Sequence, residues 1–453
     1  MLPSLIPPIP GPRSRQMAKD LRQFESPGIT YVDERFPVFW ESASGSLVHD
    51  VDGNVFLDMC AAFGVAGVGH CHPRVVEAIR RQAGKLIHGM GDVHPPALKI
   101  ELARRIAAIA PEGLQKVIFG SSGSDAVEAA LKTSAIVTKK PGVLAFYGAY
   151  HGLSYGALNV TSRSDFRAPF LAQLGRFATH LPYPDCYRCP WGKSYPNCGI
   201  ACLDSVEEAL SNRASGATEI GAAIVEPIQG RGGIITPPDG WLTGLSEVCK
   251  KHGILLIADE IFTGCGRTGE WFASEVAPDL LCLGKALGGG FPISACIGTA
   301  AVMDAWGESS GEAIHTSTFL GSPLGCAAAL AVLDVIEDED LLEKCRTAGQ
   351  RLKDGLEALK NRYPRIGDVR GRGLMIGIEM VDPSGASDSA GAVEIMFQAL
   401  QRGVILLPAG SRGNVIELVP PYIIHEDQIV FALTTLDEIL ASEESLSSSS
   451  KSG

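Results

Sequence analysis

Short apolar runs recur through the middle of this 453-residue chain, and stretches with helical periodicity separate them. The runs cover residues 117–119, 143–146, 222–225, 254–258 and 280–283, and we expect helices at 125–138, 203–212 and 242–252. Strands that are apolar throughout and alternate with helices predict a mostly parallel sheet with both faces covered. The sequence therefore predicts an α/β fold built on one large sheet.

The length of the chain predicts more than one domain, because a single small core does not serve 453 residues. After about Pro323 the pattern changes to a long helical segment at 324–359 and then to a mixed region, which predicts a smaller α+β domain. We expect an N-terminal arm with part of the small domain at 1–70, a large domain at 71–322, the C-terminal small domain at 323–440 and a disordered tail at 441–453.

The charge and the cysteines restrict the partners. A net charge of -12 argues against nucleic acid or an anionic membrane as a partner. No apolar run reaches the length of a membrane span, and residues 1–12 lack the basic region of a secretory signal. Twelve scattered cysteines are typical of reduced intracellular thiols. We expect a soluble cytoplasmic enzyme that binds neither nucleic acid nor membrane.

Two of the apolar runs lead into residues that suit a flat, phosphorylated ligand, and ligands bind at the carboxyl ends of strands in open α/β sheets. The turn at 120–125 precedes a helix, and its N–H groups and hydroxyls favour a phosphate. Ser122 with Asp125 also fits a helix capping box, which is the alternative. The run at 143–146 leads to Tyr150, whose ring would stack on a flat cofactor or pack in the core.

Two carboxylates and one amine follow the remaining runs: Glu226, Asp259 and Lys285. A carboxylate at the end of a buried strand is costly unless it has a partner. A carboxylate that pairs with a pyridinium nitrogen and an amine that forms a Schiff base are what pyridoxal phosphate (PLP) chemistry requires. A surface position is the alternative for Lys285, and its place directly after an apolar run makes this the weaker interpretation.

Taken together, these motifs closely resemble the class III aminotransferases, which are fold type I PLP enzymes that include the 4-aminobutyrate, ornithine and ω-amino acid transaminases. The resemblance covers about residues 30 to 440, and its segments are Ser122-Gly123-Ser124, Tyr150-His151-Gly152, the residues 226–230, Ala258-Asp259-Glu260, the residues 264–269, Lys285 and Thr318-Phe319. It implies a fold type I transaminase that moves an amino group between an amine or amino acid and a keto acid by a ping-pong mechanism.

The resemblance also implies a role for each site residue. Lys285 would be the catalytic residue that forms the Schiff base (internal aldimine) and moves the proton. Asp259 would bind the pyridine nitrogen, with Ile261 and Tyr150 on the two faces of the ring. The other expected cofactor contacts are Gly123, Ser124, Glu226 and, from the neighbouring subunit, Thr318. The active sites would then be shared between subunits, so we expect a homodimer or a dimer of dimers.

Four positions depart from the pattern of the family, and one of them is Leu153, in place of a basic residue that the 4-aminobutyrate enzymes carry just after the His-Gly. Phe262 replaces a Gln that often contacts the phenolic oxygen of the cofactor. Arg231 and Glu417 stand where members that use glutamate and 4-aminobutyrate carry a Glu and an Arg. We hypothesise a charge-swapped pair, in which Arg231 binds a keto-acid carboxylate and Glu417 attracts the distal ammonium of a diamine or basic amino acid. A structural salt bridge, or two unconnected charges, is an equal alternative.

Four cysteines lie in an insert at 183–202: Cys186, Cys189, Cys198 and Cys202. Four thiols in one short segment could close a tetrahedral structural zinc site. Neither a His nor a second CxxC pair accompanies them, so reduced thiols that pack the insert are the favoured interpretation.

Four further functions compete with transamination. An amino acid racemase or epimerase of the same family is the main alternative, and a decarboxylating transaminase is another. A non-catalytic binding protein with this fold is disfavoured by the presence of Lys285 and Asp259. A nucleotide-dependent oxidoreductase would rest on Gly371 and Gly373 alone, without a pyrophosphate turn after the first strand.

Overall fold

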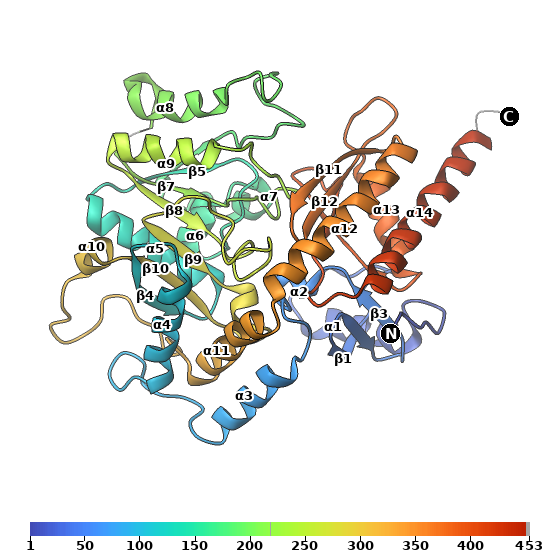
Figure 1. The fold of residues 1–453 in the computed structure, drawn as a ribbon, viewed down its shortest axis with the longest axis horizontal. Coiled ribbons are helices and arrows are strands. Elements are labelled where there is room, and N and C mark those ends of the chain that lie inside the picture. Colours follow the sequence, from blue (N-terminus) through green and yellow to red (C-terminus); the bar gives the residue numbers. More distant parts are fainter. Residues whose placement is uncertain (218, 450–453) are drawn as a thin grey trace.

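The computed structural model describes residues 1–217 and 219–449. Figure 1 shows two lobes, one built around a large sheet and the other around two smaller sheets. The strands of the large sheet are β4 (Leu114–Gly120), β5 (Gly142–Phe146), β6 (Ala178–Leu181), β7 (Ile220–Val225), β8 (Leu255–Asp259), β9 (Leu280–Leu283) and β10 (Ser294–Thr299). The α/β class and fold type I architecture predicted from the sequence are confirmed.

The large sheet has the strand order β4-β10-β9-β8-β7-β5-β6. Its neighbouring strands are parallel except for β10, which runs antiparallel to both β4 and β9. Because β10 reverses direction between its two neighbours, β4 points the same way as β9. The carboxyl ends of six strands therefore meet at one edge, where the sequence predicted the site.

Both faces of the large sheet are covered, as side-chain alternation along a strand requires. On one face, Ala222 and Ile224 of β7 pack with helix α5 (Gly123–Thr138). On the other face, Ala223 and Val225 pack with helix α9 (Trp241–His252), whose Trp241 is fully buried. Strands that are apolar at every position follow directly from this two-sided burial.

The helices surround the sheets and connect the lobes. The N-terminal part contributes α1 (Pro12–Phe24), α2 (Ala61–Gly64), α3 (Pro73–Ala83) and α4 (Ala97–Ile109), and the middle contributes α6 (Tyr155–Val160), α7 (Ser164–Arg167), α8 (Asp204–Ser211) and α10 (Ala300–Met303). The C-terminal part contributes α11 (Pro323–Asp338), α12 (Leu341–Arg362), α13 (Ser389–Leu400) and α14 (Glu426–Ser449). Among these, α3, α4 and α11 pack together beside β4.

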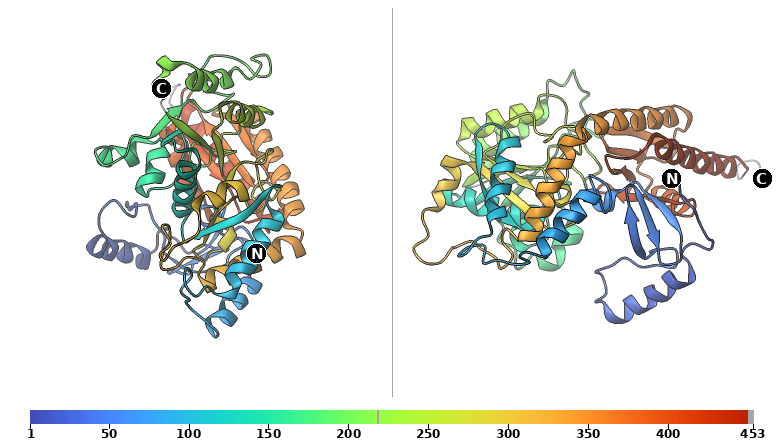
Figure 2. Two further views of the ribbon diagram at one scale, coloured as in Figure 1. Left: turned by 90° about the vertical axis from the view of Figure 1, so that its left-hand side faces the viewer. Right: turned by 60° about the horizontal axis from the view of Figure 1, so that its bottom comes forward.

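Two four-stranded sheets form the second lobe. The first has the order β1-β2-β3-β13, with strands β1 (Trp40–Ser44), β2 (Leu47–Asp50), β3 (Val55–Asp58) and β13 (Val404–Ile405). The second has the order β11-β12-β15-β14, with strands β11 (Ile366–Arg372), β12 (Met375–Met380), β15 (Val415–Leu418) and β14 (Leu407–Ala409). In the right-hand view of Figure 2, the dark blue helix α1 lies below the strands β1–β3.

Two expectations about helices differ from the structure. The segment 324–359 forms two helices instead of one, because Asp340 adopts a left-handed conformation (φ 51°) between α11 and α12. Helix α14 continues through Ser449 into the segment for which we expected a disordered tail, and residues 450–453 lie outside the described residues. The domain boundaries at 70 and 322 stay a prediction.

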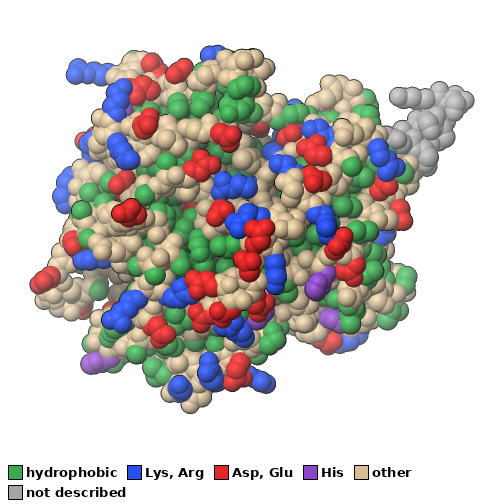
Figure 3. Space-filling model, in the orientation of Figure 1, with side chains coloured by type: hydrophobic (Ala, Val, Ile, Leu, Met, Phe, Trp, Pro, Cys, Tyr) green, Lys and Arg blue, Asp and Glu red, His purple; other side chains and the backbone are tan. Residues whose placement is uncertain are grey.

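The surface agrees with the acidic but mixed composition. On the face drawn in Figure 3, basic and acidic side chains intermingle instead of forming one large patch of a single sign. Within the described part of the chain, no helix has the length and apolarity needed to cross a membrane.

Candidate active site

A buried pair of a carboxylate and an imidazole, Asp259 and His151, lies at the end of β8. The Nδ1 atom of His151 lies 2.7 Å from Oδ2 of Asp259, and both side chains are buried. The other oxygen, Oδ1, accepts a hydrogen bond from the backbone N–H of Ile261 at 3.0 Å. Burial lowers the pKa of His151, but the hydrogen bond and charge of Asp259 outweigh it and leave this pKa above its usual value. The contact with Asp259 therefore favours the protonated form of His151.

The next carboxylate, Glu226, ends β7 and fixes two loops around the site. Its oxygens accept hydrogen bonds from the backbone N–H of Tyr150 and of Gly230, each at 3.1 Å. Burial raises the pKa of Glu226 to about 7, and the nearby charge of Asp259 adds to this, whereas His151 opposes it. Glu226 thus positions the loop that carries Tyr150 and the loop that carries Arg231.

Lys285 follows β9 in a tight 3-10 turn with a left-handed backbone conformation (φ 40°). Its ammonium lies 3.8 Å from the centre of the Phe262 ring, within the range of a cation–π contact. Burial lowers the pKa of Lys285, while the charges of Asp259, Glu226 and Glu417 oppose that effect. A lysine with a lowered pKa is more often the free amine that attacks a carbonyl carbon.

The turn after β4 is a true helix cap. Ser122 Oγ accepts from the N–H of Asp125, whose carboxylate accepts in turn from the N–H of Ser122, so the capping box is present. Capping does not occupy the whole turn, since the first N–H groups of a helix lack partners within the helix. Ile261 packs closely on Gly123: a Cβ there would lie 3.0 Å from the Ile261 side chain.

The turn at 120–125 contacts the loop that follows β5. Ser124 Oγ accepts from the N–H of Leu153 at 3.3 Å. Gly152 has φ 115°, and a Cβ at this position would lie 2.1 Å from Ser124 Oγ. Only glycine allows the two loops to approach this closely.

These residues fit PLP. Asp259 is a buried carboxylate whose two oxygens each have one partner and can accept another donor, Lys285 is a half-buried amine, and the α5 N-terminus offers N–H groups. Ile261 lies between this turn and Lys285, because it packs on both Gly123 and Gly284.

Arg231 and Glu417 reach the same region from the two lobes. Ile416 and Leu418 of β15 face the core of the second lobe, whereas Val419 packs with Phe262. Alternation therefore turns Glu417 toward Phe262 and Lys285. Glu417 is 1% exposed, and its Oε2 has no hydrogen-bond partner among the described residues.

The charges around Glu417 agree with this placement. Burial raises the pKa of Glu417 to about 7, and the charges of Arg231, Lys285 and Arg267 counteract the rise. Arg231 is half-buried. Burial raises the pKa of the Tyr150 phenol and the charge of Arg231 counteracts this rise, so Arg231 lies near that ring. Within the described residues no ion pair of 4.0 Å or less joins Arg231 and Glu417, so a structural salt bridge does not explain them.

Thr318 lies elsewhere in this protomer. It is exposed, in the long connection between β10 and α11, and the next residue, Phe319, contacts the His88 ring at 5.4 Å between centroids. This position does not place Thr318 in the site of its own chain.

The four cysteines of the insert, Cys186, Cys189, Cys198 and Cys202, line one small cavity, and none forms a disulfide. Burial raises the pKa of the Cys202 thiol to about 11. In the part of the chain that the structure describes, no group of three or more His, Cys, Asp or Glu could hold a metal ion. The zinc hypothesis gains no support, and we describe the insert as a thiol-containing loop.

Two features of the site were not predicted from the sequence. The role of His151 depends on a partner 108 residues away, and the Lys285–Phe262 contact depends on how two strand ends meet. The one local signal was that His151 directly follows Tyr150 after an apolar run.

Comparison with known proteins decides the family. The model of the class-III aminotransferases matches residues 30–440. The chain belongs to this family. A probable 4-aminobutyrate aminotransferase of Bacillus subtilis is 39% identical over 92% of this chain and 95% of the relative. An alanine/serine racemase of Pyrococcus horikoshii is 36% identical over 97% of this chain and 92% of the relative.

The solved structures agree with the family. An amine transaminase from an uncultivated Pseudomonas species, in its PLP-bound internal aldimine form, is 33% identical with a TM-score of 0.86. The match covers 93% of this chain and 98% of that one. This class-III aminotransferase is thus a PLP-dependent transaminase that acts on small amines or amino acids and keto acids.

Proposed function

We propose that the amino donor of this transaminase carries a second positive charge, as a diamine or a basic amino acid does, and that the acceptor is a keto acid. Glu417 binds the distal ammonium of the donor, and Arg231 binds the carboxylate of the acceptor. One observation carries this proposal: Glu417 is a buried carboxylate with an unpartnered oxygen on the face that looks toward Lys285. Such a group is costly unless a ligand satisfies it.

The roles of the other residues follow from the geometry. When bound, PLP supplies an aldehyde that reacts with amines and a ring that accepts electrons. Asp259, held by His151, keeps the proton on the pyridine nitrogen, and Nζ of Lys285 is the base that moves the donor's proton. The remaining contacts of the cofactor in this proposal are Gly123, Ser124, Tyr150, Glu226 and Ile261.

The test compares donors that differ only in the distal charge. With 1,4-diaminobutane and butylamine as donors, Glu417→Gln raises the KM of the diamine by roughly 10–100-fold, the loss expected for a hydrogen bond to a charged group, and leaves butylamine unchanged. Arg231→Ala raises the KM of the keto acid and spares both donors. If Glu417→Gln affects the two donors equally, the diamine proposal is wrong.

A single-turnover measurement separates transamination from the racemase activity of some relatives. A donor added without keto acid releases one equivalent of its oxo product per site in a transaminase. A racemase instead interconverts the enantiomers of an amino acid without any keto acid. Release of no oxo product from any amine would contradict the function stated here.

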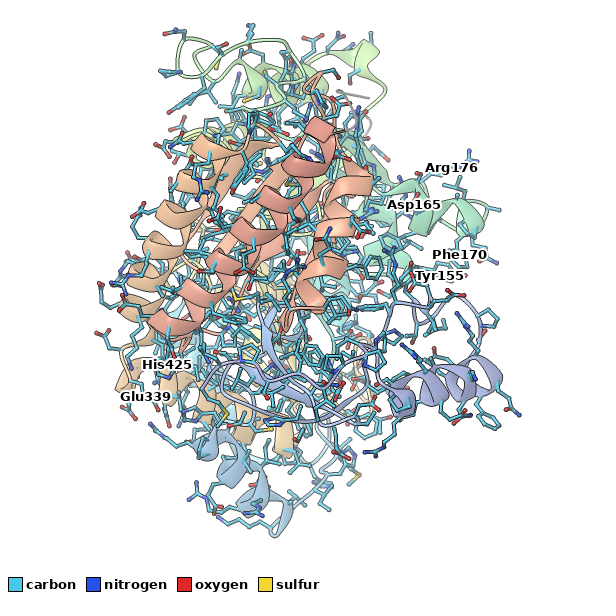
Figure 4. All side chains as sticks on the ribbon, turned by 90° about the vertical axis from the view of Figure 1, so that its right-hand side faces the viewer. Tyr155, Asp165, Phe170, Arg176, Glu339 and His425 are labelled. Atoms are coloured by element: carbon cyan, nitrogen blue, oxygen red, sulfur yellow. The ribbon has the colours of Figure 1, made fainter. Side chains whose placement is uncertain are left out.

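The proposal includes a homodimer whose partner subunit supplies Thr318. Six exposed apolar side chains lie on two segments, 86–93 and 314–319, that the His88–Phe319 contact joins: Leu86, Ile87, Met90, Val93, Ile314 and Phe319. A patch of this kind on a soluble chain indicates an interface. Tyr155 and Phe170, labelled in Figure 4, are also exposed, on the projecting segment around α7.

We also propose a cytoplasmic location and the domain division expected from the sequence. All twelve cysteines are free, as a reducing compartment favours. The large sheet lies within 71–322, and β11, β12, β14 and β15 lie within 323–440.

A further inference from the structure

We propose that Arg188 of the insert at 183–202 is a positioning residue for the active-site loop 229–235, acting through Glu379 and Arg370. The insert belongs to the lobe of the large sheet, whereas both of these partners belong to the C-terminal sheet. The proposal rests on the proposed function only where it concerns the substrate that Arg231 binds.

The insert is fixed against the C-terminal sheet at its tip. Asp185 Oδ1 accepts hydrogen bonds from the backbone N–H groups of Tyr187 and Arg188, each at 3.0 Å, which holds this turn in one shape. Tyr187 packs on Gly367 of β11, where a Cβ would lie 2.2 Å from the phenol oxygen. Arg188 therefore projects from a fixed turn onto the neighbouring lobe.

A continuous polar chain leads from Arg188 to the active-site loop. Arg188 Nε donates to Oε1 of Glu379, a side chain that is only 4% exposed. The second oxygen of Glu379 accepts from Arg370 Nη1 at 2.7 Å. Arg370 Nε then donates to the carbonyl of Gly233 at 2.9 Å.

The loop 229–235 is packed so closely against Arg370 and Gly410 that a shift of Arg370 would move the loop as well. Gly233 has φ 117°, and a Cβ there would lie 3.1 Å from the backbone of Gly410 and 3.2 Å from Arg370 Nη2. Two residues earlier, the carbonyl of Arg231 accepts from the N–H of Gly410 at 3.1 Å. The loop that carries Arg231 is thus held by hydrogen bonds to the C-terminal sheet on both sides of Gly232.

Polar contacts, more than packing, hold this junction. A cavity of about 340 Å³ lies among the insert, the loop and the C-terminal sheet, with Arg188, Gln229, Gly232, Arg370 and Glu379 in its lining. Burial raises the pKa of Glu379, but its ion pairs with Arg188 and Arg370 outweigh this and leave the pKa below its usual value. Without Arg188, Glu379 keeps Arg370 and Asn414 as partners, so the fold persists. Arg370 Nη1 also lies 3.1 Å from Oδ2 of Asp368, so the Arg370–Glu379 pair is then free to shift toward this second carboxylate.

The test uses the PLP-loaded enzyme and two readouts. In Arg188→Ala and Arg188→Gln, amide hydrogen exchange of residues 229–235 rises at least threefold, and exchange in β7 does not change. The KM of the keto acid rises about three- to tenfold with kcat within a factor of two. Arg188→Lys, which restores one charge, recovers part of both effects. Lys193→Ala, at an exposed position of the same insert, is the matched control and behaves as wild type.

The exchange readout keeps this proposal separate from the proposed function. Unchanged exchange of 229–235 in both Arg188 variants overturns the positioning role, whatever the kinetics show. If exchange rises but neither Arg188→Ala nor Arg231→Ala alters the KM of the keto acid, the positioning role stands and the substrate role of Arg231 is wrong. Equal exchange increases throughout the molecule would indicate loss of the fold and would also contradict the proposal.

Discussion

The imidazole of His151 holds the carboxylate of Asp259 by a 2.7 Å hydrogen bond in a region closed to solvent. The Nε2 atom of His151 is buried and has no partner among the described residues, so the bond to Asp259 is its one side-chain anchor there. The pair lies at the carboxyl end of β8, where we propose that the pyridine nitrogen binds. His151 therefore orients the carboxylate that the proposed function assigns to this nitrogen.

Loss of that anchor weakens PLP binding. His151→Ala raises the Kd of PLP by roughly 10–100-fold, the cost of one hydrogen bond to a charged group. Titration of the apoenzyme with PLP, followed by absorbance, gives the value. His252→Ala, at a helix end remote from the site, serves as the control. An unchanged Kd in His151→Ala would show that Asp259 needs no orientation.

Glycine at 152 is required for the contact between the turn at 120–125 and the loop that follows β5. Gly152→Ala weakens PLP binding at least tenfold, because the new Cβ would lie 2.1 Å from Ser124 Oγ. Gly290→Ala is a matched control: its φ of 112° imposes the same backbone strain as 115° at Gly152, yet nothing lies within 4 Å of the added carbon. Equal losses in the two variants would attribute the effect to strain alone.

The unpartnered carboxylate of Glu417 destabilises the apoenzyme at neutral and higher pH. Its pKa is about 7 in the folded chain against an ordinary 4.5, so the folded form binds the proton more tightly than the unfolded form. Stability therefore falls as pH rises from 4.5 to 7, by about 3 kcal/mol for this group.

Replacement of Glu417 by Gln removes that pH dependence. The Tm of apo Glu417→Gln exceeds that of the apo wild type above pH 7, and the difference shrinks toward zero as the pH falls to 4.5. Calorimetry of both proteins across this range measures it. Glu247→Gln, on the exposed side of α9, controls for the general effect of removing a surface carboxylate. A Tm difference that does not vary with pH would contradict the raised pKa.

The apolar patch predicts the oligomeric state. If the proposed dimer forms through this patch, Phe319→Asp combined with Val93→Asp gives a monomer and weakens PLP binding, because the proposed contact of Thr318 from the partner subunit is lost. Light scattering after size-exclusion chromatography gives the mass. Phe24→Asp, at an 81% exposed apolar position on α1, leaves the mass unchanged. If the double variant stays dimeric, the interface lies elsewhere.

The sequence predicted the strands of the large sheet that contain a continuous apolar run and missed β6 and β10, which do not. Strands β5, β7, β8 and β9 are apolar along nearly their whole length because both of their faces are buried, and β4 contains its run after the exposed Gln115 and Lys116. β10 escaped notice because Ser294, Gly298 and Thr299 break its apolar pattern. Gly298 has no room for a side chain, because a Cβ would lie 2.7 Å from Leu280 and 2.9 Å from Met303, and no local pattern reveals this.

The positions of Asp259 and Lys285 at strand ends agree with the sequence analysis, whereas their contacts were not predicted. Strand ends and family motifs pointed to Asp259 and Lys285, whereas the contacts of His151 and Phe262 with them join distant parts of the chain. The same limit applied to the insert: its cysteines suggested a metal, and the residue that reaches the neighbouring lobe is Arg188. Residue types along the chain could be interpreted from the sequence, whereas contacts between residues far apart in the sequence could not.

The reversed strand β10 also governs the order in which the protein can be built during synthesis. β4 and β9 have open edges until residues 294–299 emerge and pair with both of them. The sheet of β1–β3 likewise waits for Val404 and Ile405, which come from the far end of the chain. Nascent chains that stop before these residues present unpaired strand edges, the structures that seed aggregation. A chain on a ribosome stalled before residue 294 therefore exposes unpaired strand edges to which chaperones bind. Completion of the chain pairs these edges and ends the need for chaperones.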